Sequence, residues 1–211
     1  MKKTGLAILL GMTCLFSHIQ SDATTASAKT YTLQLKAKSD VKIRKSPSSK
    51  AKTLGTLKKG KKLDVIYFAD KSSYYKVKYK GKFGYVPYQN VKEVSPSGKF
   101  VGHYYDRMSA GSAGSSHLYV YEQTSKKIKY VVYSSYKNGS GIYAPYNYEK
   151  YKGAATLLSS KTARVQIKGC TGTLKLVGSD IEPVQNGQCS YSNRAFSAIV
   201  PEDGYFASVN W

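Results

Sequence analysis

The sequence predicts an all-β protein built from two small units that follow one another along the chain. Hydrophobic residues alternate with lysine or other polar residues in short runs, as they do in half-buried β-strands. In residues 75–79 the aromatic and aliphatic side chains fall on one face and the two intervening lysines on the other. Residues suited to tight turns or bulges separate the runs, among them Gly55, Gly60, Gly81 and Gly84. Helical periodicity is absent from nearly the whole chain.

The first 28 residues have the pattern of a secretory signal peptide. Two lysines follow Met1, an apolar stretch covers residues 5–16, and Ala26 and Ala28 frame a cleavage site. We expect cleavage after Ala28, with Ala23 as a poorer alternative. The apolar stretch is too short to cross the ~30 Å of hydrocarbon in a bilayer, and no transmembrane segment is expected in the mature chain. The protein is therefore predicted to be secreted, either extracellular or associated with the cell wall.

Charge divides the expected mature chain into two parts. Residues 29–95 carry 18 Lys and Arg against 4 Asp and Glu, a net charge of +14. Residues 96–211 carry 13 against 7, a net charge of +6. A Ser-Pro-Ser-Gly sequence, typical of turns, lies at the change. We therefore predict a first domain at residues 29–95, a linker at 96–98 and a second domain at 99–211.

Four motifs follow one another in the first domain. They are Val41-Lys-Ile-Arg-Lys-Ser-Pro47, Leu54-Gly-Thr-Leu-Lys-Lys-Gly60, Tyr74-Tyr-Lys-Val-Lys-Tyr79 and Gly81-Lys-Phe-Gly-Tyr-Val86. In this order and spacing, residues 35–94 resemble the bacterial Src-homology-3-like (SH3-like, or SH3b) domain. Ser46 stands where that family usually has glycine, and Tyr75 where it often has tryptophan. The resemblance implies an SH3-like barrel that attaches secreted bacterial proteins to peptidoglycan or related surface polymers, without catalysis.

Tyrosine is unusually frequent, with 20 residues in the chain. Its ring stacks on sugars or packs within β layers. Tyr74, Tyr75, Tyr85 and Tyr88 lie in the first domain, near Arg44, in the part that the resemblance assigns to the ligand groove. These five residues are the predicted ligand-binding site. Core packing is the alternative role for Tyr75 and Tyr85, whereas Tyr74 and Tyr88 are the candidates for exposed positions.

The lysines of the first domain predict an anionic partner. At moderate salt the Debye length is about 10 Å, comparable to the radius of a small barrel, so the lysines act as one positive field. A solubilising surface remains the alternative role for any single lysine. Outside a Gram-positive cell the abundant polyanions are teichoic acids and wall carboxylates, and secretion makes nucleic acid a poor candidate. We expect peptidoglycan or teichoic-acid-type polyanions as partners, no cofactor and a monomeric protein.

The second domain is predicted to be a small barrel or sandwich of about eight strands. The segments that predict strands are 118–122, 128–134, 154–158, 163–168, 171–177, 180–185, 196–200 and 206–209, with irregular segments at 109–116 and 136–151. Cys170 and Cys189 are the cysteines that follow the signal peptide. We predict a disulfide between them, worth about 3 kcal/mol in the chain-entropy account.

The sequence predicts neither a catalytic nor a metal site. His103 and His117 both precede Cys170, whereas the cell-wall cysteine peptidases that carry such barrels place the nucleophile before the histidine. The cysteines and histidines also lack a zinc-finger spacing. Each histidine is interpreted as a surface or strand residue, and the protein as a non-enzyme. Two alternatives stay open: a cell-wall hydrolase that uses His103, and an interaction protein, because the segments around Cys170 and Cys189 are similar to a secreted bacterial β-barrel module that includes lysozyme inhibitors.

Overall fold

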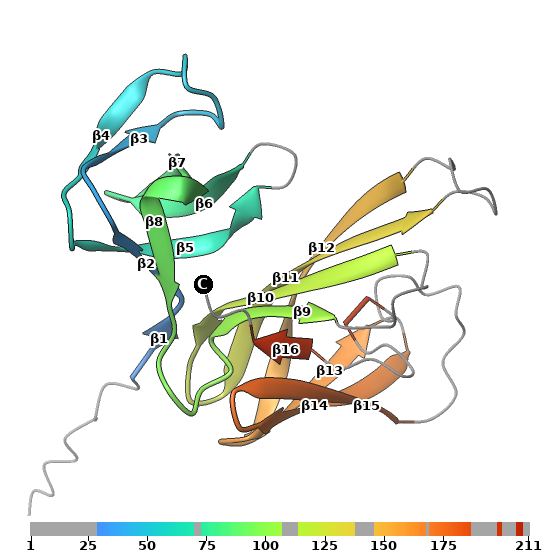
Figure 1. Ribbon diagram of the computed structural model, residues 1–211. Coiled ribbons are helices and arrows are strands. Elements are labelled where there is room, and N and C mark those ends of the chain that lie inside the picture. Colours follow the sequence, from blue (N-terminus) through green and yellow to red (C-terminus); the bar gives the residue numbers. More distant parts are fainter. Residues whose placement is uncertain are drawn as a thin grey trace, which may run out of the picture.

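The computed structural model describes residues 29–69, 73–106, 114–137, 146–167, 169–186, 198–199 and 206–208. Its strands form two sheets, one of seven and one of nine strands, and Figure 1 shows them as two units, between which the chain passes after β1 and again after β8. The all-β prediction is confirmed. Within the described residues, no helix has the length and apolar character that a membrane crossing requires. The predicted signal peptide at residues 1–28 lies outside the described residues.

The seven-stranded sheet forms the first barrel. Its elements are β2 (Gln34–Ala37), β3 (Val41–Arg44), β4 (Thr53–Leu57), β5 (Lys62–Ala69), β6 (Tyr74–Tyr79), β7 (Lys82–Pro87), the 3-10 helix η1 (Tyr88–Asn90) and β8 (Val91–Val94). The strand order is β4-β3-β7-β6-β5-β2-β8. On β6 the predicted alternation is confirmed, because Tyr75 and Val77 are buried and Lys78 is exposed.

Two glycines in this barrel meet specific backbone demands. Gly81 has a φ of 76° and follows Lys80, with a φ of 46°, so the pair makes the tight turn between β6 and β7. A Cβ at Gly84 would lie 2.5 Å from Cγ2 of Ile43, which shows that β7 and β3 approach too closely there for any larger residue.

The nine-stranded sheet forms the second barrel. Its elements are β1 (Tyr31–Thr32), β9 (Gly102–Asp106), β10 (Gly114–Gln123), β11 (Lys127–Lys137), β12 (Tyr146–Ser159), β13 (Thr162–Ile167), β14 (Cys170–Val177), β15 (Asp180–Asn186) and β16 (Phe206–Ser208). From β9 to β16 each strand pairs antiparallel with the next, and β16 pairs back with β9. The eight strands therefore close into an up-and-down barrel, which agrees with the predicted small barrel rather than with a sandwich.

Several predicted boundaries in the second domain are wrong. Residues 102–106 form an unpredicted strand, and residues 146–151, predicted as irregular, form the first part of β12. Ser115 and Ser116 belong to β10 rather than to a loop, because their hydroxyls lie 2.9 and 3.2 Å from those of serines on β11. Ala198 and Ile199 form a turn instead of a strand, and the rest of that predicted segment lies outside the described residues. Polar and tyrosine-rich segments thus became strands through cross-strand pairing.

The two barrels share a hydrophobic contact. On β10, Leu118 and Val120 point into the second barrel, whereas Tyr119 packs with the core of the first barrel together with Val101 and Val131. Strands β10 and β11 are therefore buried on both faces. In addition, β1 pairs with β10, although it precedes the first barrel in the chain.

The predicted disulfide remains a prediction. Cys170 is buried at the start of β14. Cys189 lies outside the described residues.

Candidate functional site

The five predicted ligand residues lie on different parts of the first barrel. Tyr85 lies opposite Arg44 on one side and Lys76 on the other, so these three residues form a row across β3, β7 and β6. Tyr74 is half-buried at the start of β6. Tyr75 points into the core, which confirms the alternative considered for it, and Tyr88 is exposed on η1. The structure therefore does not gather the five residues into one groove.

The outer face of β6 and β7 combines lysines with exposed rings. Phe83 is 57% exposed, and Nζ of Lys76 lies 4.4 Å from the centroid of its ring. Arg44 is less available, because its Nη1 donates a 2.9 Å hydrogen bond to the carbonyl oxygen of Ala51. The sequence prediction missed Phe83. The signal in the sequence was the strand alternation, in which Gly84 and Val86 face inward and Phe83 therefore faces outward.

A second basic and aromatic cluster joins the two barrels around Tyr67. Lys150 of β12 donates a 2.6 Å hydrogen bond to the Tyr67 hydroxyl and lies over its ring. Lys76 and Lys152 each lie 5.7 Å from the centroid of the same ring. Burial alone would raise the pKa of Tyr67, but the Lys150 hydrogen bond and the charges of the three lysines lower it below its usual value. Positive charge thus continues from the first barrel onto the second.

A cavity of about 330 Å³ lies between the barrels. One wall comes from the first barrel and η1, and the other from β9 and β10. Its lining residues are Lys38, Tyr75, Tyr88, Gln89, Val91, Lys92, Glu93, His103, His117 and Tyr119. The cavity is therefore lined by two of the predicted ligand residues, from the first domain, and by His103 and His117, from the second.

A chain of buried polar groups runs through this cavity. The side chains of Glu93 and His103 are 5% and 4% exposed, and Oε1 of Glu93 lies 3.4 Å from Nδ1 of His103. Neither of these two atoms makes a hydrogen bond. Nε2 of His103 lies 2.9 Å from Nδ1 of His117. Burial, together with the charge of Glu93 and a hydrogen bond to it, raises the pKa of Tyr75 well above its usual value.

Aromatic packing holds the two imidazoles in place. Tyr119 stacks on His103, with centroids 4.0 Å apart and an interplanar angle of 13°. The Tyr105 ring lies 4.8 Å from that of His117. Burial, followed by the neighbouring His103, lowers the pKa of His117 to about 4, so His117 is neutral near pH 7. The histidines lie on strands, as interpreted, but His103 is not a surface residue.

This arrangement is able to bind a polar group or to pass a proton between the imidazoles. Among the described residues, no serine, threonine or cysteine side chain hydrogen-bonds to His103 or His117. The described part of the chain also holds no group of three His, Cys, Asp or Glu side chains arranged to bind a metal ion. The cavity thus places one carboxylate and two imidazoles next to one another.

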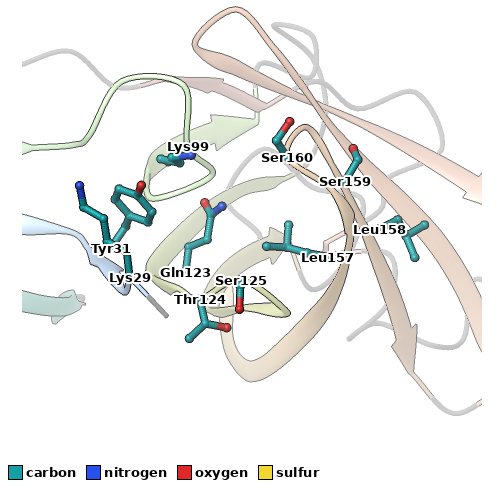
Figure 2. Close-up of a pocket in the computed structure, with 10 residues that line it drawn as sticks. All are labelled: Lys29, Tyr31, Lys99, Gln123, Thr124, Ser125, Leu157, Leu158, Ser159 and Ser160. Carbon is teal, nitrogen blue, oxygen red and sulfur yellow. The ribbon is translucent and has the colours of Figure 1, made fainter. Parts of the chain in front are cut away.

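A larger and more open cavity of about 440 Å³ lies at one end of the second barrel. Figure 2 shows Lys29, Tyr31 and Lys99 on one side of it and residues 157–160 on the other. Nζ of Lys99 and of Lys29 lie 4.7 and 5.3 Å from the Tyr31 ring centroid. Gln123 already accepts a 2.9 Å hydrogen bond from the amide of Phe100. This cavity therefore adds basic surface but offers no open buried acceptor among its described residues.

Comparison with known families identifies the first barrel. Residues 39–92 match the family model of the bacterial SH3 domain, which confirms the resemblance predicted for residues 35–94. The matched segment contains all five predicted ligand residues, and also Phe83. A comparison with proteins of curated function finds no match.

Proposed function

We propose that this is a secreted, non-catalytic protein that binds the bacterial cell wall through its SH3 domain, with peptidoglycan or anionic wall polymers as the ligand. The observation that carries the proposal is the match of residues 39–92 to the bacterial SH3 domain, a domain of cell-wall-binding type. The second barrel packs against this domain and contributes basic residues beside it.

The charge of the first barrel supports an anionic ligand. Lysines that are exposed on its surface include Lys36, Lys38, Lys42, Lys45, Lys50, Lys52, Lys58, Lys59, Lys61, Lys62, Lys78, Lys80, Lys82 and Lys92. Of these, only Lys58 takes part in an ion pair within the described residues, with Asp40 at 2.7 Å. The lysines repel one another, and a polyanion that binds across several of them relieves this repulsion. Such binding weakens as salt screens the charges.

The outer face of β6 and β7 is the surface best suited to a wall polymer. It places the exposed ring of Phe83 beside Lys76 and next to Tyr85. An aromatic ring packs on the apolar face of a sugar, while a neighbouring lysine binds a phosphate or carboxylate. The Tyr67 cluster extends the same chemistry towards the second barrel.

Sedimentation with purified cell walls tests the proposal. We expect the protein comprising residues 29–211 to pellet with walls at low salt and to be released as salt rises. The double substitution Lys76→Glu and Lys78→Glu reverses two charges on the proposed face, where Lys76 lies over the Phe83 ring and Lys78 lies opposite Phe83. Lys161→Glu and Lys175→Glu make the same charge change on exposed residues of the second barrel and serve as the control.

The two pairs of substitutions distinguish a binding face from general charge attraction. The first pair is expected to reduce pelleting much more than the control pair. Walls stripped of teichoic acid show which polymer is bound. No pelleting of the wild-type protein at low salt would rule out the proposal.

A cell-wall hydrolase is the second candidate, favoured by the buried series Glu93, His103 and His117. A carboxylate close to imidazoles is a common component of general acid–base catalysis. The test is a gel containing cell walls. Clearing by the wild-type protein that is lost in His103→Ala would favour the hydrolase, whereas absence of clearing in both supports the non-catalytic proposal.

A further inference from the structure

The cavity between the barrels contains a carboxylate with unused acceptor capacity. The Glu93 side chain is nearly fully buried, and its Oε1 makes no hydrogen bond. The carboxylate accepts a hydrogen bond from the Tyr75 hydroxyl, but a buried Oε1 that has lost its water and gained no hydrogen bond is still unfavourable. This oxygen lines a cavity large enough for a small molecule. The missing donor is therefore expected to come from a ligand.

His103 does not fill this role in the observed geometry. Its Nε2 faces Nδ1 of His117 at 2.9 Å, so one of the two nitrogens donates to the other. If Nε2 of His103 donates, then in the neutral ring Nδ1 carries a lone pair that faces the carboxylate at 3.4 Å. If His117 donates, Nδ1 of His103 carries the proton but is not aligned for a hydrogen bond. In both cases, and also in a ring protonated on both nitrogens, the observed geometry leaves Oε1 of Glu93 without a hydrogen bond.

The cavity walls select the kind of donor. Tyr75, Tyr88, Tyr119 and Val91 line the same cavity as the Glu93 carboxylate. Aromatic faces attract a cation, and the carboxylate adds to this attraction. A sugar would bring many hydroxyl groups into a mainly apolar space with few buried partners, at a cost for each one left without a hydrogen bond. A single ammonium group on an apolar chain fits the walls better.

The exposed side of the cavity carries positive charge and therefore favours an anionic group. Lys38 and Lys92 line the cavity and are exposed to solvent. They would repel a simple cation but attract an anionic group at the outer end of the ligand. We propose that the cavity between the two barrels binds a zwitterionic ligand of about amino-acid size, with its ammonium group at Glu93, its apolar chain against the tyrosines and its anionic end at Lys38 and Lys92. This site is separate from the proposed wall-binding face and does not depend on it.

Isothermal titration calorimetry with ε-aminocaproate, an apolar chain with an ammonium and a carboxylate at its ends, tests the site. We expect saturable binding to the full mature protein. Caproate, which lacks the ammonium, and n-hexylamine, which lacks the carboxylate, are expected to bind at least about tenfold more weakly. A loss of this size is typical when a hydrogen bond to a charged group is removed.

Two variants with matched controls locate the binding. Glu93→Gln keeps the shape of the side chain and is expected to weaken ε-aminocaproate at least about tenfold, whereas Glu182→Gln, on the exposed face of β15, leaves it unchanged. Tyr88→Ala removes a ring that is 45% exposed and is expected to weaken binding without unfolding the barrel. Val177→Ala is its control, because Val177 is an exposed hydrophobic residue outside the cavity.

The outcomes that overturn the proposal are distinct from a failure of wall binding. Absence of saturable binding, equal binding of caproate or n-hexylamine, or equal binding by Tyr88→Ala and Glu93→Gln would each refute it. Thermal unfolding shows whether Glu93→Gln is folded. If Glu93→Gln is not folded, the binding of ε-aminocaproate to Tyr88→Ala tests whether the ligand occupies the cavity. Sedimentation of Glu93→Gln with cell walls is expected to match that of the wild-type protein.

Discussion

Replacing His117 by asparagine is expected to remove part of the pH dependence of folding stability. His117 lies on β10 at the junction of the barrels, where burial and His103 lower its pKa from 6.5 to about 4. The unfolded chain therefore takes up a proton at this residue before the folded protein does. As pH falls from 6.5 to about 4, the free energy of unfolding should decrease, and this loss should end below pH 4.

The magnitude follows from the difference between the two pKa values. A difference of about 2.5 pH units, at 1.36 kcal/mol per unit, gives a loss of about 3 kcal/mol across this range. That is a large part of the stability of a small domain. The side-chain amide of asparagine can donate a hydrogen bond to Nε2 of His103 or accept one from it, so it can replace Nδ1 of His117 in either role. Asparagine does not titrate, so this part of the pH dependence of the unfolding free energy is lost while the contact with His103 is kept.

Urea unfolding at a series of pH values from about 3 to 7.5, a range that brackets the two pKa values, measures this effect. The quantity to compare is the difference in unfolding free energy between the wild-type protein and His117→Asn. Other groups, including His103 and Glu93, are present in both proteins. The unfolding free energy of the wild-type protein minus that of His117→Asn should decrease by up to about 3 kcal/mol as pH falls from 6.5 to 4. Parallel stability curves for the two proteins would show that His117 titrates normally and that the reasoning is wrong.

Three further predictions follow from single contacts. Gly84→Ala should destabilise the first barrel by about 1–3 kcal/mol, because the new Cβ would lie 2.5 Å from Ile43; equal urea midpoints for the two proteins would contradict this. Lys150→Met should raise the pKa of Tyr67, since it removes the hydrogen bond and the nearest positive charge; NMR titration of the tyrosine ring carbons detects this, with Lys175→Met as the unaffected control. Cys170 and Cys189 should resist alkylation until a reductant is added, and reduction should lower stability by about 3 kcal/mol; modification of both thiols in the unfolded, unreduced protein would exclude the bridge.

The first barrel was accessible from the sequence because its determinants are local. The alternation around Val77 and the glycines at 81 and 84 define strands and turns within a few residues of one another. The same pattern placed Tyr75 among candidates for the core, and the structure shows it buried. Exposure was harder to predict, as Phe83 shows. Its ring faces outward beside Lys76, and only the pairing of β6 with β7 brings the two together.

The cavity between the barrels had no such local signature. Glu93 ends the first barrel, and His103 and His117 come from two strands of the second. In the register of β9 and β10, His103 lies opposite Tyr119 and His117 opposite Tyr105, so the stacked aromatic residues depend on pairing between distant parts of the chain. Position 103 alone gives no indication of burial, because its surroundings are set by the docking of the two barrels.

By itself, the sequence determined the all-β class, the SH3 domain, the basic surface and the approximate number of strands in the second unit. Period-two alternation, turn residues and net charge are properties of short segments, and they persist in any compact arrangement of those segments. Only the tertiary structure decided that β10 and β11 are buried on both faces and that Glu93 meets two histidines in one cavity. These features arise from strand register and from contact between the barrels, which depend on the packing of the whole chain.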